Sequence, residues 1–335
     1  MTRNPALARA AEVLLRAESV WIGTHVDPDG DAIGSALGLA LLLEGLGRRV
    51  TVHCQDAVPD EAAFLPGVDR LGHRPPTDGE TAVALDVAEP ARLGRLYLAD
   101  SWSRLVTVVI DHHASNPGFG TVNVIDPSRS STAEMVTDIA LVMGASIEAD
   151  AATCLLTGIV TDTLGFRTSN TTADTLQTAH ELVLCGARLT EVTHHVFHRR
   201  PLANLRLTAL ALQRLTRAGP FAMTMLHQRD LDACGATAEA ARGITSLLAT
   251  ADEPAAVALL RERPDGDIDV SLRSKPGVDL LPAARALGGG GHSQAAGARL
   301  PGPMEAAGAA VFRALEEGVR LPRGWDMPRD GIGPA

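Results

Sequence analysis

Residues 19–47 read SVWIGTHVDPDGDAIGSALGLALLLEGLG and place an apolar run, a polar loop and a helical segment in direct succession. Residues 19–24 suit a buried strand, and residues 31–46 carry apolar side chains at helical spacing until Gly47 ends the pattern. Three further apolar runs have strand character, at residues 49–54, 81–86 and 105–110. This alternation of strand and helix predicts a parallel sheet covered by helices.

The chain of 335 residues is longer than one hydrophobic core usually serves, so we expect two domains. The pattern is largely helical over residues 131–216, and Pro201 is predicted to begin a helix that connects the domains. Apolar runs return in the last third of the chain, at residues 221–226, 255–260 and 268–272.

We therefore expect an α/β fold, with a parallel-sheet N-terminal domain, a smaller α/β C-terminal domain and the active site in the cleft between them. The predicted divisions are residues 1–195 for the N-terminal domain, 196–219 for a helical linker, 220–321 for the C-terminal domain and 322–335 for a poorly ordered tail.

The composition limits the classes of function. Hydrophobic residues make up 45% of the chain and charged residues 21%, which is typical of a globular protein. The formal net charge is −10, whereas a protein that grips duplex nucleic acid is usually basic, so duplex binding is disfavoured. Small anionic substrates fit this charge if bound cations supply positive charge locally.

The cysteines and the apolar runs point to the cytoplasm. The four cysteines lie far apart and form no CxxC pair, which disfavours both a disulfide framework and a thiolate metal site. The first twenty residues lack the order of segments found in a signal peptide, and no apolar run has the length of a membrane span. We expect a cytoplasmic protein with no membrane association.

The polar loop after the first predicted strand contains His25, Asp27, Asp29 and Asp31 at every second position. In an extended loop alternate side chains point the same way, so several of them can converge on one point. Carboxylate oxygens suit hard divalent cations, and imidazole nitrogens add donors suited to Mn²⁺. The alternative is an Asp-rich turn that caps the following helix.

Three more pieces carry the same donor types. Asp86 ends the third predicted strand, Asp111, His112 and His113 follow the fourth, and Asp162 follows an apolar helix-like run. Each piece alone has a simpler explanation as a cap, a turn or a polar helix face. In open α/β sheets, however, ligands bind at the carboxyl ends of the strands. The combined set has enough donors for two cations with a bridging carboxylate, which is the arrangement that activates water for phosphoester hydrolysis.

These pieces, in their order, resemble the four motifs of the DHH phosphoesterase superfamily. The run from Gly288 to His292, with Gly297 after it, resembles the glycine-rich motif of the DHH-associated C-terminal domain. The resemblance covers about residues 15 to 320. It is strongest to the branch that contains oligoribonucleases acting on short RNA, phosphatases of 3′-phosphoadenosine 5′-phosphate and cyclic di-AMP phosphodiesterases.

The resemblance implies a role for each residue of the N-terminal motifs. One metal would be bound by His25, Asp29 and Asp86, and the second by Asp31, Asp86, His112 and Asp162. His113 would contact the scissile phosphate and assist the leaving group, and Asp111 would orient this histidine. Position 27 is often Asn in relatives, so Asp27 is a candidate catalytic residue that adds negative charge and tunes metal affinity.

The resemblance also implies a phosphate grip in the C-terminal domain. His292 and the backbone amides of Gly289, Gly290 and Gly291 would hold a substrate phosphate, because amides can approach an anion where no Cβ intervenes. Arg273 is a candidate clamp for the same phosphate. Leu164 stands where a small residue is common in relatives and is expected to reshape the pocket beside Arg167, a further substrate-binding candidate.

The expected function is the metal-dependent hydrolysis of phosphoester bonds in short nucleotides by a water that two metal ions activate. The expected substrates are oligoribonucleotides of a few residues, linear or cyclic dinucleotides and 3′-phosphoadenosine 5′-phosphate. The expected cofactors are two Mn²⁺ ions, with Mg²⁺ or Co²⁺ as alternatives, and the family implies a homodimer. Two alternatives stay open: a pyrophosphatase or exopolyphosphatase of the same superfamily, and a non-catalytic nucleotide sensor.

Overall fold

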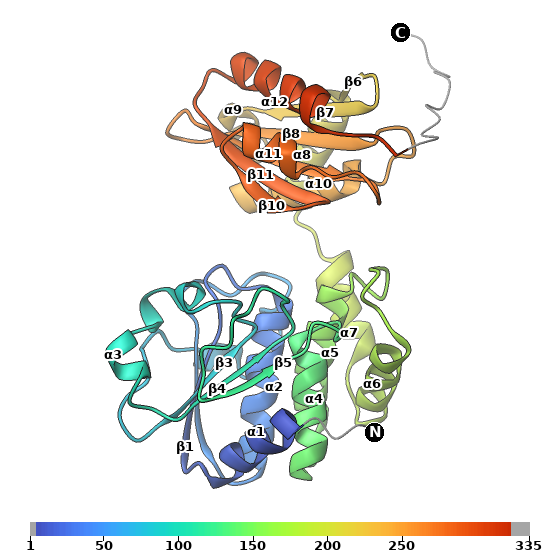
Figure 1. The fold of residues 1–335 in the computed structure, drawn as a ribbon. Coiled ribbons are helices and arrows are strands. Elements are labelled where there is room, and N and C mark those ends of the chain that lie inside the picture. Colours follow the sequence, from blue (N-terminus) through green and yellow to red (C-terminus); the bar gives the residue numbers. More distant parts are fainter. Residues whose placement is uncertain (1–4, 323–335) are drawn as a thin grey trace. The chain divides into compact units, whose positions relative to one another are not determined.

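The computed structural model describes residues 5–322 (Figure 1). The chain divides between Arg199 and Arg200 into two compact units, each of which is described by itself. The predicted cleft between two domains and the predicted homodimer stay predictions. Nearly all of the predicted tail, residues 323–335, lies outside the described residues. No helix among the described residues is both long enough and apolar enough to span a bilayer.

A parallel sheet of five strands forms the centre of the first unit (Figure 1), in the order β2-β1-β3-β4-β5. The strand bounds are Ser19–Gly23 for β1, Arg49–His53 for β2, Thr81–Leu85 for β3, Thr107–Asp111 for β4 and Val122–Ile125 for β5. The predicted parallel α/β fold is thus confirmed. Strand β5 is an addition to the four predicted strands, because VNVI is too short and too mixed to stand out as an apolar run.

Helices cover both faces of this sheet. One core contains Val20, Val83 and Val108 of the sheet, packed against four helices: α1 (Pro5–Arg16), α2 (Gly30–Gly45), α4 (Thr132–Met143) and α5 (Ala149–Asp162). The opposite face carries Trp21 and Val109 and packs against the short segments η2 (Pro90–Leu96) and α3 (Ala99–Trp102). The three inner strands β1, β3 and β4 are buried from both sides, so their sequences are almost continuously apolar, whereas the edge strands β2 and β5 are more mixed.

Helices α2 and α5 approach each other closely because glycine occupies the contact. A Cβ built on Gly34 would lie 2.4 Å from the carbonyl oxygen of Cys154, and a Cβ on Gly158 would lie 2.5 Å from Oδ1 of Asp31. This contact fixes the C-terminal end of α5 beside the N-terminal end of α2. The remaining helices of the unit are η1 (Val68–Arg70), α6 (Ala173–Leu184), α7 (Leu189–Thr193) and η3 (His194–His198).

The second unit contains a mixed sheet of six strands in the order β10-β11-β9-β8-β7-β6. The bounds are Thr216–Ala218 for β6, Phe221–Leu226 for β7, Ala256–Glu262 for β8, Ile268–Ser274 for β9, Gly290–His292 for β10 and Ala295–Leu300 for β11. Only β7 and β8 pair in parallel within the described residues. Strands β10 and β11 are rich in glycine and alanine, so the apolar pattern of the sequence does not reveal them.

Each face of the second sheet has its own core. Helices α11 (Leu281–Ala286) and α12 (Met304–Gly318) pack on one face. Helices α8 (Leu202–Gln213), α9 (Gln228–Cys234) and α10 (Arg242–Leu248) form a core on the other, and η4 (Ala238–Ala241) precedes α10. Helix α8 begins directly after Pro201, within the segment predicted as a linker, and buries Leu207 and Ala211 in the core of this unit.

Candidate metal centre

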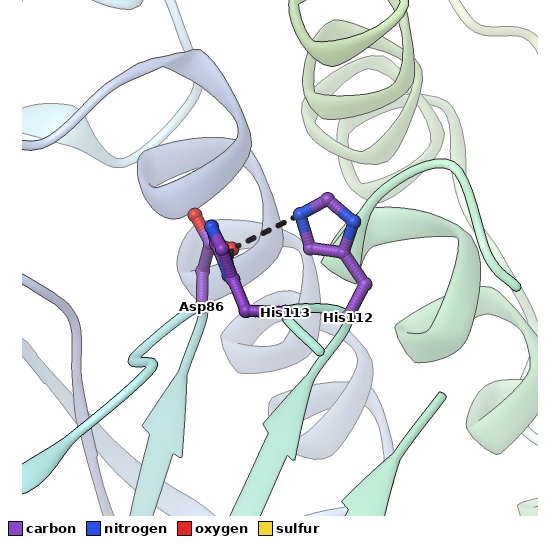
Figure 2. Close-up of side chains that lie close together, drawn as sticks. All are labelled: Asp86, His112 and His113. Carbon is purple, nitrogen blue, oxygen red and sulfur yellow. Dashed lines mark ion pairs between the residues drawn. The ribbon is translucent and has the colours of Figure 1, made fainter. Parts of the chain in front are cut away.

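The carboxyl ends of three neighbouring parallel strands carry the first group of predicted ligands. His25 follows β1 by two residues, Asp86 follows β3 directly, and His112 and His113 follow β4. Strands β1 and β4 flank β3 in the sheet, so these side chains meet at one edge. Figure 2 shows Asp86 at the end of its strand with the rings of His112 and His113 beside it.

The N-terminal end of α2 supplies two further carboxylates. Asp29 is the N-cap residue, and its Oδ1 accepts hydrogen bonds of 3.0 Å from the backbone N–H groups of Asp31 and Ala32. Asp31 is fully buried, and its carboxylate accepts hydrogen bonds from the backbone N–H groups of Thr132 (2.7 Å) and Ala133 (2.9 Å) at the start of α4. Helix N-termini stabilise negative charge, so both carboxylates occupy favourable positions.

Asp162 reaches the site from a distant part of the chain. It is the last residue of α5, one helical turn after Gly158, which packs against Asp31. Its Oδ2 lies 3.2 Å from Nε2 of His112. The close packing of α2 on α5 therefore brings a carboxylate from residue 162 to the edge formed by the strands.

The donor atoms form overlapping groups that share Asp86 and His112. Each group places one donor atom per residue within 4.8 Å of the others: His25, Asp29 and Asp86; Asp31, His112 and Asp162; and Asp86, His112 and His113. Oδ2 of Asp86 lies 3.4 Å from Nε2 of His25, and Oδ1 lies 3.6 Å from Nε2 of His112. The Asp86 carboxylate thus faces His25 of one donor group with one oxygen and His112 of another group with the other oxygen. A ligand that bridges two cations requires this arrangement.

The protonation of these groups is strongly perturbed. Burial raises the pKa of Asp162 to about 10, and the charges of Asp31 and Asp86 add to this effect. Burial also raises the pKa of Asp31. At Asp86 burial acts in the same direction, but contact with His25 and the charge of His112 hold its pKa below the ordinary value. So many carboxylates in one buried place are costly unless protons or cations compensate them, and this oxygen and nitrogen donor set fits divalent cations.

His25 has a second contact that bears on metal binding. Its Nδ1 lies 2.9 Å from the carbonyl oxygen of Val26 and 3.0 Å from a guanidinium nitrogen of Arg92. Only one of the two contacts can be a hydrogen bond at a time, because the guanidinium nitrogen only donates. When Nδ1 carries a proton and donates it to the carbonyl, the lone pair of Nε2 is free for a cation. Arg92 was not singled out by the sequence, because nothing near it in the chain marks it as a neighbour of residue 25.

His113 differs from the other two histidines. Its Nδ1 lies 2.8 Å from Oδ1 of the fully buried Asp111, while Oδ2 of Asp111 accepts a hydrogen bond of 2.7 Å from the side chain of Asn116. The bond to Asp111 raises the pKa of His113 to about 9. The protonated ring can therefore donate from Nε2 to an oxygen of a substrate. Asn116, which also bonds the carbonyl of Val87, carries no signal in the sequence.

Besides Asp111, two predicted residues of the first unit lie outside these groups. Asp27 has a left-handed backbone (φ 56°), an exposed side chain and a backbone N–H that donates to Oδ2 of Asp56 (2.8 Å). Arg167 is exposed, donates from Nε to the carbonyl of Leu164 (2.6 Å) and lies over the ring of Phe197. Leu164 itself has φ 48° and is 52% exposed. No metal group among the described residues includes Asp27.

The predicted phosphate-binding residues of the second unit come together on its sheet. His292, Ala295 and Arg273 are aligned on the neighbouring strands β10, β11 and β9. The glycine run has a structural role that the sequence did not indicate. A Cβ on Gly289 would lie 2.0 Å from the carbonyl oxygen of Gly297, and one on Gly291 would lie 2.5 Å from that of Ala295. Strand packing therefore demands these two glycines, whereas Gly290 faces open space.

Comparison with known proteins gives consistent results. The family model described as "DHH family, N-terminal domain" matches residues 19–159, and the "DHHA1 domain" matches residues 224–318. The chain is 38% identical over 314 residues to the bifunctional oligoribonuclease and PAP phosphatase NrnA of Thermus thermophilus, which covers 92% of each protein.

Two further relatives extend the comparison. The chain is 29% identical to the cyclic-di-AMP phosphodiesterase PdeA of Listeria monocytogenes over 86% of this chain and 46% of that protein. A crystal structure of an exopolyphosphatase-related protein from Bacteroides fragilis matches with a TM-score of 0.88 and 26% identity, and covers 95% of this chain and 98% of that chain.

Proposed function

This chain belongs to the DHH family, and from that membership we propose that it hydrolyses phosphoester bonds of short nucleotides with two divalent cations at the carboxyl edge of its parallel sheet. The expected resemblance to this family is confirmed. The observation that carries the proposal is the position of Asp86, whose two oxygens face His25 on one side and His112 on the other.

Each cation would have its own ligands beside the shared Asp86. His25 and Asp29 would complete the first set, and Asp31, His112 and Asp162 the second. Mixed nitrogen and oxygen donors suit Mn²⁺ better than Mg²⁺, which prefers oxygen alone, so we propose Mn²⁺ as the cation. When bound, a cation pair polarises the phosphoryl group and lowers the pKa of a shared water into the physiological range.

The protein's own contribution to the reaction lies in positioning and proton transfer. Asp111 holds Nδ1 of His113, so the ring keeps one orientation and presents Nε2. We propose that His113 donates this proton to the leaving oxygen of the substrate, where a cleaved alkoxide needs it. Asn116 keeps Asp111 in place from the other side.

The second unit would hold the substrate. Arg273 is partly buried, burial lowers its pKa, and its guanidinium has no carboxylate partner among the described residues. A desolvated cation of this kind favours an anionic ligand. His292 lies in the same row of the sheet two strands away, about 10 Å from Arg273 at the usual spacing of neighbouring strands. We propose that both residues bind a phosphate of the nucleotide.

A substrate panel tests this function. In Mn²⁺ we expect turnover of an RNA dinucleotide or trinucleotide, cyclic di-AMP or 3′-phosphoadenosine 5′-phosphate, and little turnover of pyrophosphate. EDTA should abolish activity and Mn²⁺ should restore it. The Asp86→Ala variant should be inactive, whereas Asp60→Asn, which removes an exposed carboxylate outside the metal groups, should keep wild-type activity.

Other outcomes of the panel favour other functions. Preferred hydrolysis of pyrophosphate or polyphosphate would support an exopolyphosphatase-type enzyme. The relative from Bacteroides fragilis is described as exopolyphosphatase-related. Binding of a cyclic dinucleotide by the Mn²⁺-loaded protein without cleavage would support a nucleotide sensor. Chelator-insensitive turnover would contradict the two-metal mechanism.

A further inference from the structure

One face of the second sheet carries three aligned rows of residues, which we name the basic row, the glycine row and the arginine row. Residues directly opposite each other on paired strands point to the same face, and alternate residues along a strand do so too. The basic row is His292, Ala295 and Arg273; the glycine row is Gly290, Gly297 and Ser271; the arginine row is Arg299, Asp269 and Arg261.

This face is exposed at its β10 and β11 side, where Gly290, His292 and Arg299 are exposed, whereas its β9 residues are half-buried. Val257 and Leu259 of β8 share the face and belong to the core formed by α8, α9 and α10. In the described part of the unit, that core contains no residue of β9, β10 or β11. The intervening residues of β9, such as Val270, point to the opposite face and into the core beneath α11 and α12. The three rows are therefore accessible at their β10 and β11 ends.

The arginine row concentrates positive charge in a chain whose net charge is −10. Asp269 accepts hydrogen bonds from Arg261, from Nη1 of Arg263 (3.2 Å) and from Nε of Arg299 (3.4 Å), while Arg263 also contacts Asp265. Three guanidinium groups thus face two carboxylates. The Arg299 side chain is 56% exposed, and its two terminal nitrogens form no hydrogen bond within the described residues.

The glycine row lies between the two charged rows and exposes mainly backbone, because two of its three residues are glycines. Gly290 and Gly297 have no side chain, and a Cβ on Gly290 would meet nothing within 4 Å. Arg273 and Asp269 are four residues apart on β9, which corresponds to about 13 Å along a strand. The rise per nucleotide of a stacked strand is about 3.4 Å, so a separation of about 13 Å corresponds to about four nucleotides. The two rows therefore suit two different phosphates of one short strand.

We propose that the arginine row, through Arg299, binds a second phosphate of the nucleotide strand whose first phosphate is held by Arg273 and His292. This face would then favour oligonucleotides longer than a dinucleotide over mononucleotide and cyclic dinucleotide substrates. The inference rests on the proposed function, because it assumes a substrate that is a short strand.

The test compares adenylate tetranucleotide and dinucleotide, both 5′-phosphorylated, by calorimetric binding in EDTA and by KM in Mn²⁺. Arg299→Gln should weaken binding of the tetranucleotide about fivefold, which is typical for loss of an exposed ion pair, and should change dinucleotide binding little. The salt dependence of tetranucleotide binding should become shallower by about 0.7 in log–log slope. Arg299→Lys keeps the charge and should bind both ligands like the wild type.

A matched control removes a charge from the opposite side of the sheet. Arg313 is an exposed arginine of α12, which packs on the other face, so Arg313→Gln should leave both ligands unaffected. Equal weakening of both ligands by Arg299→Gln, or unchanged tetranucleotide binding, would overturn the inference. Wild-type protein that binds the tetranucleotide through Arg299 but cleaves neither ligand would instead contradict the proposed function alone.

Discussion

The hydroxyl of Thr132 donates a hydrogen bond of 3.0 Å to Oδ1 of Asp86, the carboxylate that faces all three imidazoles of the metal centre. The backbone N–H of the same threonine donates to Oδ2 of Asp31. One fully buried residue at the start of α4 thus holds two predicted ligands, one from the end of β3 and one from the start of α2.

Replacement of Thr132 tests whether this hydroxyl orients Asp86. Thr132→Val keeps the shape and the backbone bond but removes the donor, so Mn²⁺ affinity should fall about 10- to 100-fold, as for other outer partners of metal ligands. Thr132→Ser keeps the hydroxyl and should restore most of the affinity. Calorimetric Mn²⁺ titration and the spin coupling between the two Mn²⁺ ions report this directly, and wild-type values in the valine variant would refute the role.

Gly158→Ala should disturb the metal centre through packing. The added Cβ would lie 2.5 Å from Oδ1 of Asp31 and 2.6 Å from Cβ of Ala133. Overpacking of this kind costs about 1–3 kcal/mol, which outweighs the roughly 1 kcal/mol that Ala usually gains over Gly in a helix. Chemical denaturation should therefore show a less stable protein, with weakened Mn²⁺ binding.

Gly45 provides the control for this substitution. It also lies in a helix, and its Cβ would meet nothing within 4 Å, so Gly45→Ala should be neutral or stabilising. A Gly158→Ala variant that behaves like Gly45→Ala would show that α2 and α5 can separate at no cost.

The effect of Asp162→Asn on the melting temperature should have opposite signs in metal-free protein and in protein loaded with Mn²⁺. In EDTA burial and the negative charges of Asp31 and Asp86 raise the pKa of Asp162 to about 10, so at neutral pH folding forces this group to take up a proton, which costs stability. The neutral Asn side chain avoids this cost and should raise the melting temperature. In Mn²⁺ the wild type gains stability from its bound ligand and should melt higher than the variant. Asp60→Asn, at an exposed position, should shift neither curve. A variant that is less stable than the wild type under both conditions would contradict the protonation cost assigned to Asp162.

Glu80 should contribute to the loss of folding stability at low pH. Both carboxylate oxygens accept hydrogen bonds from Arg74 (2.6 and 2.8 Å), and one also accepts from the backbone and hydroxyl of Thr77. Burial would raise the pKa of Glu80, but these bonds outweigh it and hold the pKa at about 2 instead of 4.5.

The lowered pKa of Glu80 determines the direction in which stability changes with pH. The unfolded chain binds the proton first, so the stabilisation by Glu80 is complete above about pH 4.5 and is lost as the pH falls through 2. Glu80→Gln should lower the free energy of unfolding at pH 7 and flatten its decline between pH 4.5 and 2. Glu18→Gln, at an exposed carboxylate, should follow the wild-type curve, and an unchanged decline in Glu80→Gln would refute the assignment.

Much of the first unit can be predicted from local sequence. Each of β1, β3 and β4 is a mostly apolar run; Asp86 and His112 follow their strands directly, and His25 follows β1 by two residues. Strand ends are local features, and parallel strands gather their carboxyl ends at one edge. The chain order of the motifs therefore predicted the candidate site before any contact was known.

The tertiary structure alone decided which residues support that site. Thr132 meets Asp86 across 46 positions of the chain, and the rows of the second sheet depend on the register of strands whose small residues give no apolar pattern. Close packing against the neighbouring strand requires Gly289 and Gly291. From the sequence alone these glycines were predicted to bind a phosphate. Periodicity determines where an element begins and which face it buries, whereas contacts between elements depend on packing that no local pattern encodes.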